Sequence, residues 1–154
     1  VMEAAQTTFI SSTFWTERIG PTAALKTLEV MEKMNSWDII TAQGKKVQNG
    51  WKSLAETHDL SISVTGMPAL STYSFNSESA IEYKTFVAQE MLKKDFLAST
   101  NFYACTEHKD KNIDDYFNAL DGVYKTISDC EKGNKNILDL LEGPICHSGF
   151  KRLN

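Results

Sequence analysis

The sequence predicts an α+β fold, in which a small, mostly antiparallel sheet carries helices on one face and is preceded by a strand and long helices. Three observations lead to this prediction: β-branched runs alternate with helical apolar spacing, a Gly-Met-Pro turn signal separates two short strand-like runs, and apolar residues fall on one side of the last long helix. Strands are expected over 7–12, 60–65, 69–75 and 97–105, and helices over 20–34, 37–58, 80–96, 113–130 and 136–142.

The boundaries of the first two helices rest on local signals. Gly20 and Pro21 precede an apolar stripe, and proline is favoured in the first turn of a helix. Ser36 is expected to cap the second helix. Gly44 and Gly50 lie inside that helix, where glycine is unfavourable, so they predict either a bend or a close packing contact.

Composition excludes several classes of protein. The 154 residues are 42% hydrophobic and 23% charged with a formal net charge of -4, which suits an ordinary globular domain and not a nucleic-acid binder. No apolar run is long enough to cross a bilayer. Three widely spaced cysteines favour neither a disulfide framework nor a zinc site, so we expect a reduced, cytoplasmic setting with no bound metal.

The segment 11–22 is the most unusual part of the chain, because four hydroxyl side chains precede the Gly-Pro helix start. Hydroxyls and free N–H groups at a helix start suit a phosphate, although such residues more often only cap a helix. Beside them, Glu17 and Arg18 are candidates for orienting a charged substrate, or form a solvated surface pair. Trp15 is a candidate for stacking on a ring, or for a core or interface role.

Other side chains give weaker signals. A Schiff-base lysine needs a partly desolvated pocket, and no lysine of this chain lies in an apolar strand–turn setting, so no catalytic residue is assigned. Cys146 and His147 are adjacent, but adjacency alone does not make a nucleophile and base, and a thiol hydrolase is a minor alternative.

The run TTFISSTFWTERIGPTAALKTLEVMEK resembles the segment that follows the cofactor lysine in class-III pyridoxal-phosphate-dependent aminotransferases of the glutamate-1-semialdehyde aminomutase type. Three later runs resemble the same family, namely NGWKSLAETHDL, SVTGMPALSTYSF and FLASTNFYACTEHKDKNIDDYFNALDGVYK. The likeness covers most of the chain. It departs from the aminomutase pattern at 15–20, which is longer, and at Thr100 and Asn101, where no glutamate stands.

The resemblance implies a fold-type I enzyme that works as a homodimer with pyridoxal 5'-phosphate on a small amino or keto substrate. It implies that Thr13, with Ser12, contacts the cofactor phosphate of the partner subunit, and that Trp15, Glu17 and Arg18 line the substrate entrance. The cofactor lysine would lie upstream of Val1, so we expect a fragment that is inactive alone.

The resemblance also implies an organisation into parts. Residues 1–36 would end the cofactor-binding large domain and its connecting helix, 37–133 would form the small α+β domain, and 134–154 a tail. The departures leave open a related aminotransferase with another substrate. The main alternative is a non-catalytic, stand-alone α+β interaction module, which the lack of a catalytic lysine favours.

Overall fold

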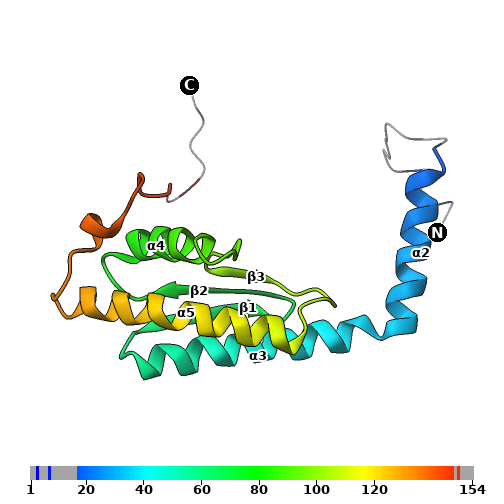
Figure 1. Ribbon diagram of the computed structural model, residues 1–154. Helices are drawn as coiled ribbons and strands as arrows, with labels where there is room; N and C mark the ends of the chain where they lie inside the picture. The colour runs from blue at the N-terminus through cyan, green and yellow to red at the C-terminus, as the bar shows by residue number, and fades with distance from the viewer. Residues whose placement is uncertain (1–2, 4–6, 8–16, 148, 150–154) are drawn as a thin grey trace. The chain divides into compact units, whose positions relative to one another are not determined.

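The computed structural model describes Glu3, Thr7, residues 17–147 and Gly149 (Figure 1). Contacts between Cα atoms divide the chain into two compact units, residues 1–36 and residues 37–154. The strand expected over 7–12 lies outside the described residues, apart from Thr7.

Helix α2, Ile19–Met34, is the regular element of the first unit. It begins beside the Gly-Pro pair as predicted, and it ends where Asn35 adopts a left-handed conformation with φ 52° and donates its N–H to Glu32. Asparagine tolerates this conformation better than most residues. The apolar side chains of α2 are exposed, with exposed fractions of 70% for Leu25 and 61% for Leu28. The apolar stripe of α2 therefore has no buried residue.

Helix α3, Ser36–Thr57, carries both of the glycines that the sequence singles out. A Cβ at Gly44 would overlap the backbone carbonyl of Pro68, and a Cβ at Gly50 would overlap the ring of Phe117. The second expected explanation, close packing, therefore holds for both. The prediction for Ser36 is wrong, because this residue is inside the helix and its buried hydroxyl has no hydrogen-bond partner among the described residues.

The sheet has three antiparallel strands in the order β1 (Ile62–Met67), β2 (Leu70–Phe75) and β3 (Asn101–Tyr103). The first two form a hairpin in which Met67 pairs with Leu70. Gly66 next to the turn has φ 88°, which glycine adopts at little cost. Strand β3 is much shorter than the predicted 97–105, but the predicted small antiparallel sheet is confirmed.

One face of the sheet carries the core, and three helices cover it (Figure 1). Residues alternate along β2, so that Tyr73 and Phe75 are buried while Ser74 is exposed. The ring of Tyr73 lies 4.7 Å from that of Trp51 in α3, measured between centroids. The ring of Phe75 lies 5.5 Å from Tyr83 in α4 (Ala80–Leu92) and 5.6 Å from Tyr124 in α5 (Asp110–Glu131). The prediction that helices cover one face is thus confirmed.

Three helices also differ from the sequence prediction, in where they end, where they begin or how long they are. Helix α4 stops at Leu92, because Asp95 takes φ 65° and the chain turns so that Phe96 N–H donates to Met91. Helix α5 begins at Asp110, earlier than expected. The last helix is a short 3₁₀ turn, η1, at Ile137–Leu140.

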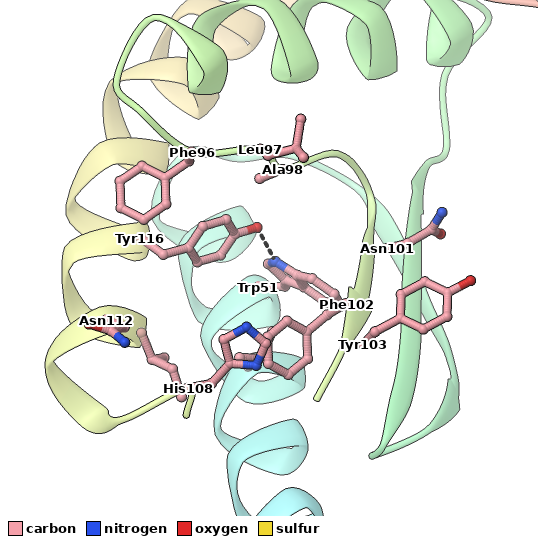
Figure 2. Close-up of a pocket in the computed structure, with 12 residues that line it drawn as sticks. Trp51, Phe96, Leu97, Ala98, Asn101, Phe102, Tyr103, His108, Asn112 and Tyr116 are labelled. Carbon is pink, nitrogen blue, oxygen red and sulfur yellow. Dashed lines mark hydrogen bonds between the residues drawn. The ribbon is translucent and has the colours of Figure 1, made fainter. Parts of the chain in front are cut away.

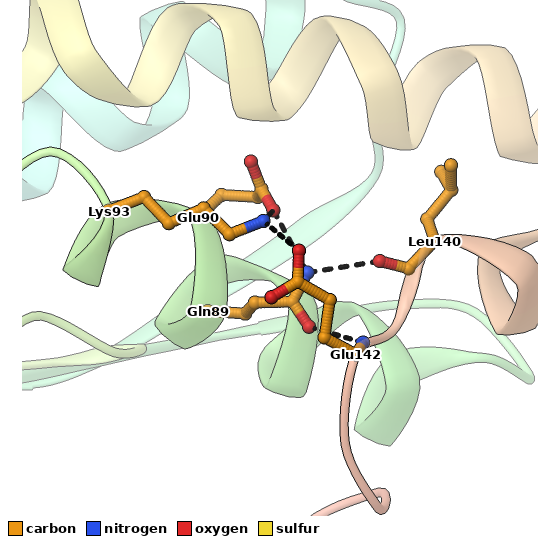
Figure 3. Close-up of polar contacts among 5 residues, drawn as sticks. All are labelled: Gln89, Glu90, Lys93, Leu140 and Glu142. Atoms are coloured by element: carbon orange, nitrogen blue, oxygen red, sulfur yellow. Dashed lines mark hydrogen bonds and ion pairs between the residues drawn. The ribbon is translucent and has the colours of Figure 1, made fainter.

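The C-terminal segment after η1 is held on α4 by a side-chain amide (Figure 3). Gln89 donates from Nε2 to the carbonyl of Leu140 at 3.0 Å and accepts from the N–H of Glu142 at 2.8 Å. Lys93 pairs with both Glu90, at 2.6 Å, and Glu142, at 2.7 Å. One glutamine therefore satisfies two backbone groups of a segment that has no strand partner.

Replacing Gln89 with alanine is expected to release this segment, because both backbone groups lose their partner at once. Hydrogen exchange at the Glu142 amide should become at least about tenfold faster, as expected from the loss of roughly 1.4 kcal/mol. Lys93→Ala serves as the control, since it removes only exposed ion pairs. Equal protection of the Glu142 amide in the Gln89 variant and the parent would contradict this role.

Candidate functional site

A cavity of about 310 Å³ lies in the second unit, between α3, the segment 96–98, β3 and the start of α5. We call it the aromatic pocket, because half of the described residues that line it carry aromatic rings (Figure 2). The described residues that line it are Val47, Trp51, Phe96, Leu97, Ala98, Asn101, Phe102, Tyr103, His108, Asn112, Ile113 and Tyr116. Concave, largely apolar sites of this size are typical of small-molecule binding.

A hydrogen bond between the buried ring of Trp51 and the half-buried ring of Tyr116 fixes one wall of the pocket. The indole Nε1–H of Trp51 donates to the hydroxyl oxygen of Tyr116 at 2.8 Å (Figure 2). Burial raises the pKa of Tyr116 well above its ordinary value, and the hydrogen bond from Trp51 offsets only part of that rise. The phenol therefore stays neutral and keeps its hydrogen at any ordinary pH.

Another part of the wall is a tilted pair of rings, with an interplanar angle of 40°. The centroids of Phe102 and His108 lie 4.8 Å apart. His108 Nδ1 accepts the backbone N–H of Cys105 at 3.1 Å, so the neutral ring carries its hydrogen on Nε2. This placement was not predicted, because His108 stands in a charged, polar stretch, and only its proximity to an apolar strand hints at it.

The aromatic pocket does not fit pyridoxal phosphate. No Lys, Arg, Asp or Glu is among the described residues that line it, so it offers neither an amine for an aldehyde nor a cation for a phosphate. More widely, every lysine in the described part of the chain is at least partly exposed. Several are held by carboxylates, such as Lys46 between Asp110 at 3.0 Å and Asp114 at 2.7 Å.

The residues predicted to contact cofactor and substrate are in the first unit. Ser12, Thr13 and Trp15 lie outside the described residues. Glu17 accepts hydrogen bonds from the N–H groups of Ile19 and Gly20, the latter at 2.9 Å to Oε2. A carboxylate is favourable at this end of a helix. The anion position at the start of α2 is therefore occupied by the chain's own Glu17, and Arg18 beside it is exposed.

The structure offers no support for a thiol hydrolase. Cys146 and His147 both line a second cavity, with Lys84, but no hydrogen bond joins the thiol to the imidazole among the described residues. The Cys146 backbone N–H donates instead to Thr85 Oγ1 at 3.0 Å. Among the residues that the structure describes, no three His, Cys, Asp or Glu side chains lie close enough together to hold a metal ion.

No helix in the described residues is long and apolar enough to span a membrane. No family model matches the chain.

Comparison with solved structures shows first which fold the chain shares. The solved structure of the FumI protein of Sphingopyxis sp. MTA144, in its pyridoxal phosphate internal aldimine form, is similar over 91% of this chain and 34% of its own, with a TM-score of 0.72 and 17% identity. At this identity the likeness establishes the fold, which is that of part of a pyridoxal phosphate protein.

Two curated relatives make the class more specific. The 3-aminobutyryl-CoA aminotransferase of Cloacimonas acidaminovorans (strain Evry) is 27% identical over 114 residues, covering 71% of this chain and 28% of the relative. The glutamate-1-semialdehyde 2,1-aminomutase of Persephonella marina (strain DSM 14350 / EX-H1) is 23% identical over 117 residues, covering 67% of this chain and 27% of the relative.

The chain thus spans little more than a quarter of the length of these curated relatives. It is a region like that of class-III, pyridoxal-phosphate-dependent aminotransferases and aminomutases, and the resemblance stated from its sequence is confirmed. Pyridoxal phosphate is the cofactor that these similarities support.

Proposed function

We propose that this chain is part of a pyridoxal-phosphate-dependent enzyme that transfers an amino group on a small amino or keto substrate, glutamate-1-semialdehyde-like or related. The observation that carries the proposal is that a sequence likeness to two such enzymes and a fold likeness to a pyridoxal phosphate protein fall on the same chain. When bound, the cofactor supplies an electron sink, and the protein supplies binding, orientation and electrostatics.

In this proposal the first unit serves the cofactor and the substrate entrance. Thr13, with Ser12, donates hydrogen bonds to the phosphate of the partner subunit in a cytoplasmic homodimer. Trp15 and Arg18 line the entrance, where Arg18 offers a bidentate fork to a substrate carboxylate. Glu17 lines it too, and its two hydrogen bonds to α2 support a role in holding the entrance backbone in place.

The lysine that holds the cofactor is, in the same proposal, not one of this chain's residues. The partial exposure of every described lysine supports this. The chain alone should therefore lose added pyridoxal phosphate on dialysis. Cofactor absorbance that survives dialysis, and that borohydride fixes onto one of these lysines, would refute the assignment.

Replacing Thr13 with valine in the complete protein is expected to weaken the binding of pyridoxal phosphate by about tenfold, because one charge-assisted hydrogen bond to the phosphate is lost without a change in side-chain shape. Equilibrium dialysis of the cofactor measures the change. The matched control is Thr7→Val, the same substitution ahead of the hydroxyl-rich turn. Unchanged cofactor affinity in the Thr13 variant would exclude the phosphate contact.

A further inference from the structure

The aromatic pocket holds a hydrogen-bond donor that the protein itself does not use. Tyr116 accepts the indole N–H of Trp51 through its oxygen, and its own O–H finds no acceptor among the described residues. A phenol can donate and accept at once. An unpaired donor in a buried setting costs free energy, which a ligand that brings an acceptor oxygen would recover.

A second donor faces the same space. The Nε2–H of His108 is left without a partner among the described residues, because the hydrogen bond from Cys105 fixes the other ring nitrogen as the acceptor. The pocket therefore offers donors on the rings of Tyr116 and His108, among walls that are apolar apart from the amides of Asn101 and Asn112. This pattern suits a carbonyl oxygen attached to an apolar body.

The charge of the pocket limits the ligand further. Apart from the His108 imidazole, no Lys, Arg, Asp or Glu side chain is on the wall, so a charged ligand would lose its hydration with little compensation from opposite charge. At its rim, Leu97 is 98% exposed and Tyr103 is 70% exposed. The exposed part of the pocket thus includes apolar surface from Leu97 and the ring of Tyr103, beside the exposed Asn101 and Asn112.

We propose that the aromatic pocket binds neutral carbonyl compounds that carry an aromatic ring, with the ring between the Phe96, Phe102 and Trp51 walls and the carbonyl oxygen accepting from Tyr116. The proposed binding site uses neither of the residues proposed for the cofactor contacts, Ser12 and Thr13. Its test needs neither pyridoxal phosphate nor turnover, so failure of either proposal leaves the other standing.

Ligand-observed NMR titration of the complete chain tests the proposal with three probes of matched shape. Acetophenone carries the ring and the carbonyl, α-methylstyrene replaces the carbonyl oxygen with a methylene, and benzoate adds a charge. We expect saturable binding of acetophenone, and binding of benzoate weaker by about tenfold or more. Tyr116→Phe should weaken the binding of acetophenone by about fivefold, which corresponds to the loss of one hydrogen bond of roughly 1 kcal/mol. The binding of α-methylstyrene should stay unchanged.

A second variant keeps the test decisive if Tyr116→Phe fails to fold. Ala98→Leu adds three carbons to the wall of the pocket and should weaken the binding of both acetophenone and α-methylstyrene. Its matched control is Ala42→Leu, the same change at an exposed position of α3 outside the pocket, which should weaken neither. Equal binding of benzoate and acetophenone, or acetophenone binding unaffected by Ala98→Leu, would overturn the proposal.

Discussion

Gly44→Ala is expected to lower the free energy of unfolding by about 3 kcal/mol. The single methyl group would overlap the carbonyl carbon and oxygen of Pro68. These are backbone atoms of the β1–β2 turn, which cannot rotate away as a side chain can, so α3 and the hairpin must separate. Urea denaturation followed by circular dichroism measures the change.

A matched control lies in α5. Gly122 is also in a helix interior, but the nearest atom to an added Cβ is Lys94 Nζ at 3.7 Å. Gly122→Ala should therefore raise the free energy of unfolding by about 0.5–1 kcal/mol through helix propensity alone. If the two alanine variants changed stability in the same direction, the close approach of α3 to the turn would be wrong.

Trp51→Ala is expected to lower the free energy of unfolding by about 3–5 kcal/mol. Trp51 is 1% exposed and its ring packs 4.7 Å from that of Tyr73 on the covered face of the sheet. The substitution leaves a cavity between α3 and β2 and also removes the hydrogen bond to Tyr116. Thermal or urea unfolding of the variant gives the loss directly.

Trp37→Ala is the control for this prediction, because it makes the same change in the same helix at a residue that is 48% exposed. We expect it to alter stability by no more than about 0.5 kcal/mol. A loss in Trp37→Ala as large as that in Trp51→Ala would mean that the burial along α3 has been assigned to the wrong side of the helix.

Much of the fold is predictable from the sequence because its signals are local. Apolar spacing located the long helices within a few residues, and the turn signal at 66–68 located the hairpin. The errors arise where tertiary contacts decide. Nothing in the local sequence shows that the chain turns back at Asp95, or that only three residues after 97 find a strand partner in β2.

The aromatic pocket was not predicted, for the same physical reason. Its walls come from α3, β3 and α5, and the Trp51–Tyr116 hydrogen bond joins residues 65 positions apart. Residue types alone indicated the hydroxyl-rich segment 11–16 and the charged pair after it as the candidate site. Of that group the described residues include Glu17 and Arg18, and the role of Glu17 as a helix cap depends on backbone geometry that composition does not reveal.

The short length of β3 affects how easily a strand from another molecule could pair with the sheet. Outer strands with unpaired backbone groups can recruit a strand from another molecule, and short outer strands give such an intruder little to pair with. With three residues, β3 offers only a few free N–H and C=O groups. At the other edge of the sheet, which is formed by β1, Gln48 Nε2 donates a hydrogen bond to the carbonyl of Gly66 at 3.2 Å. The β3 edge thus gives an incoming strand little to pair with, while on the β1 edge one carbonyl already has a side-chain partner.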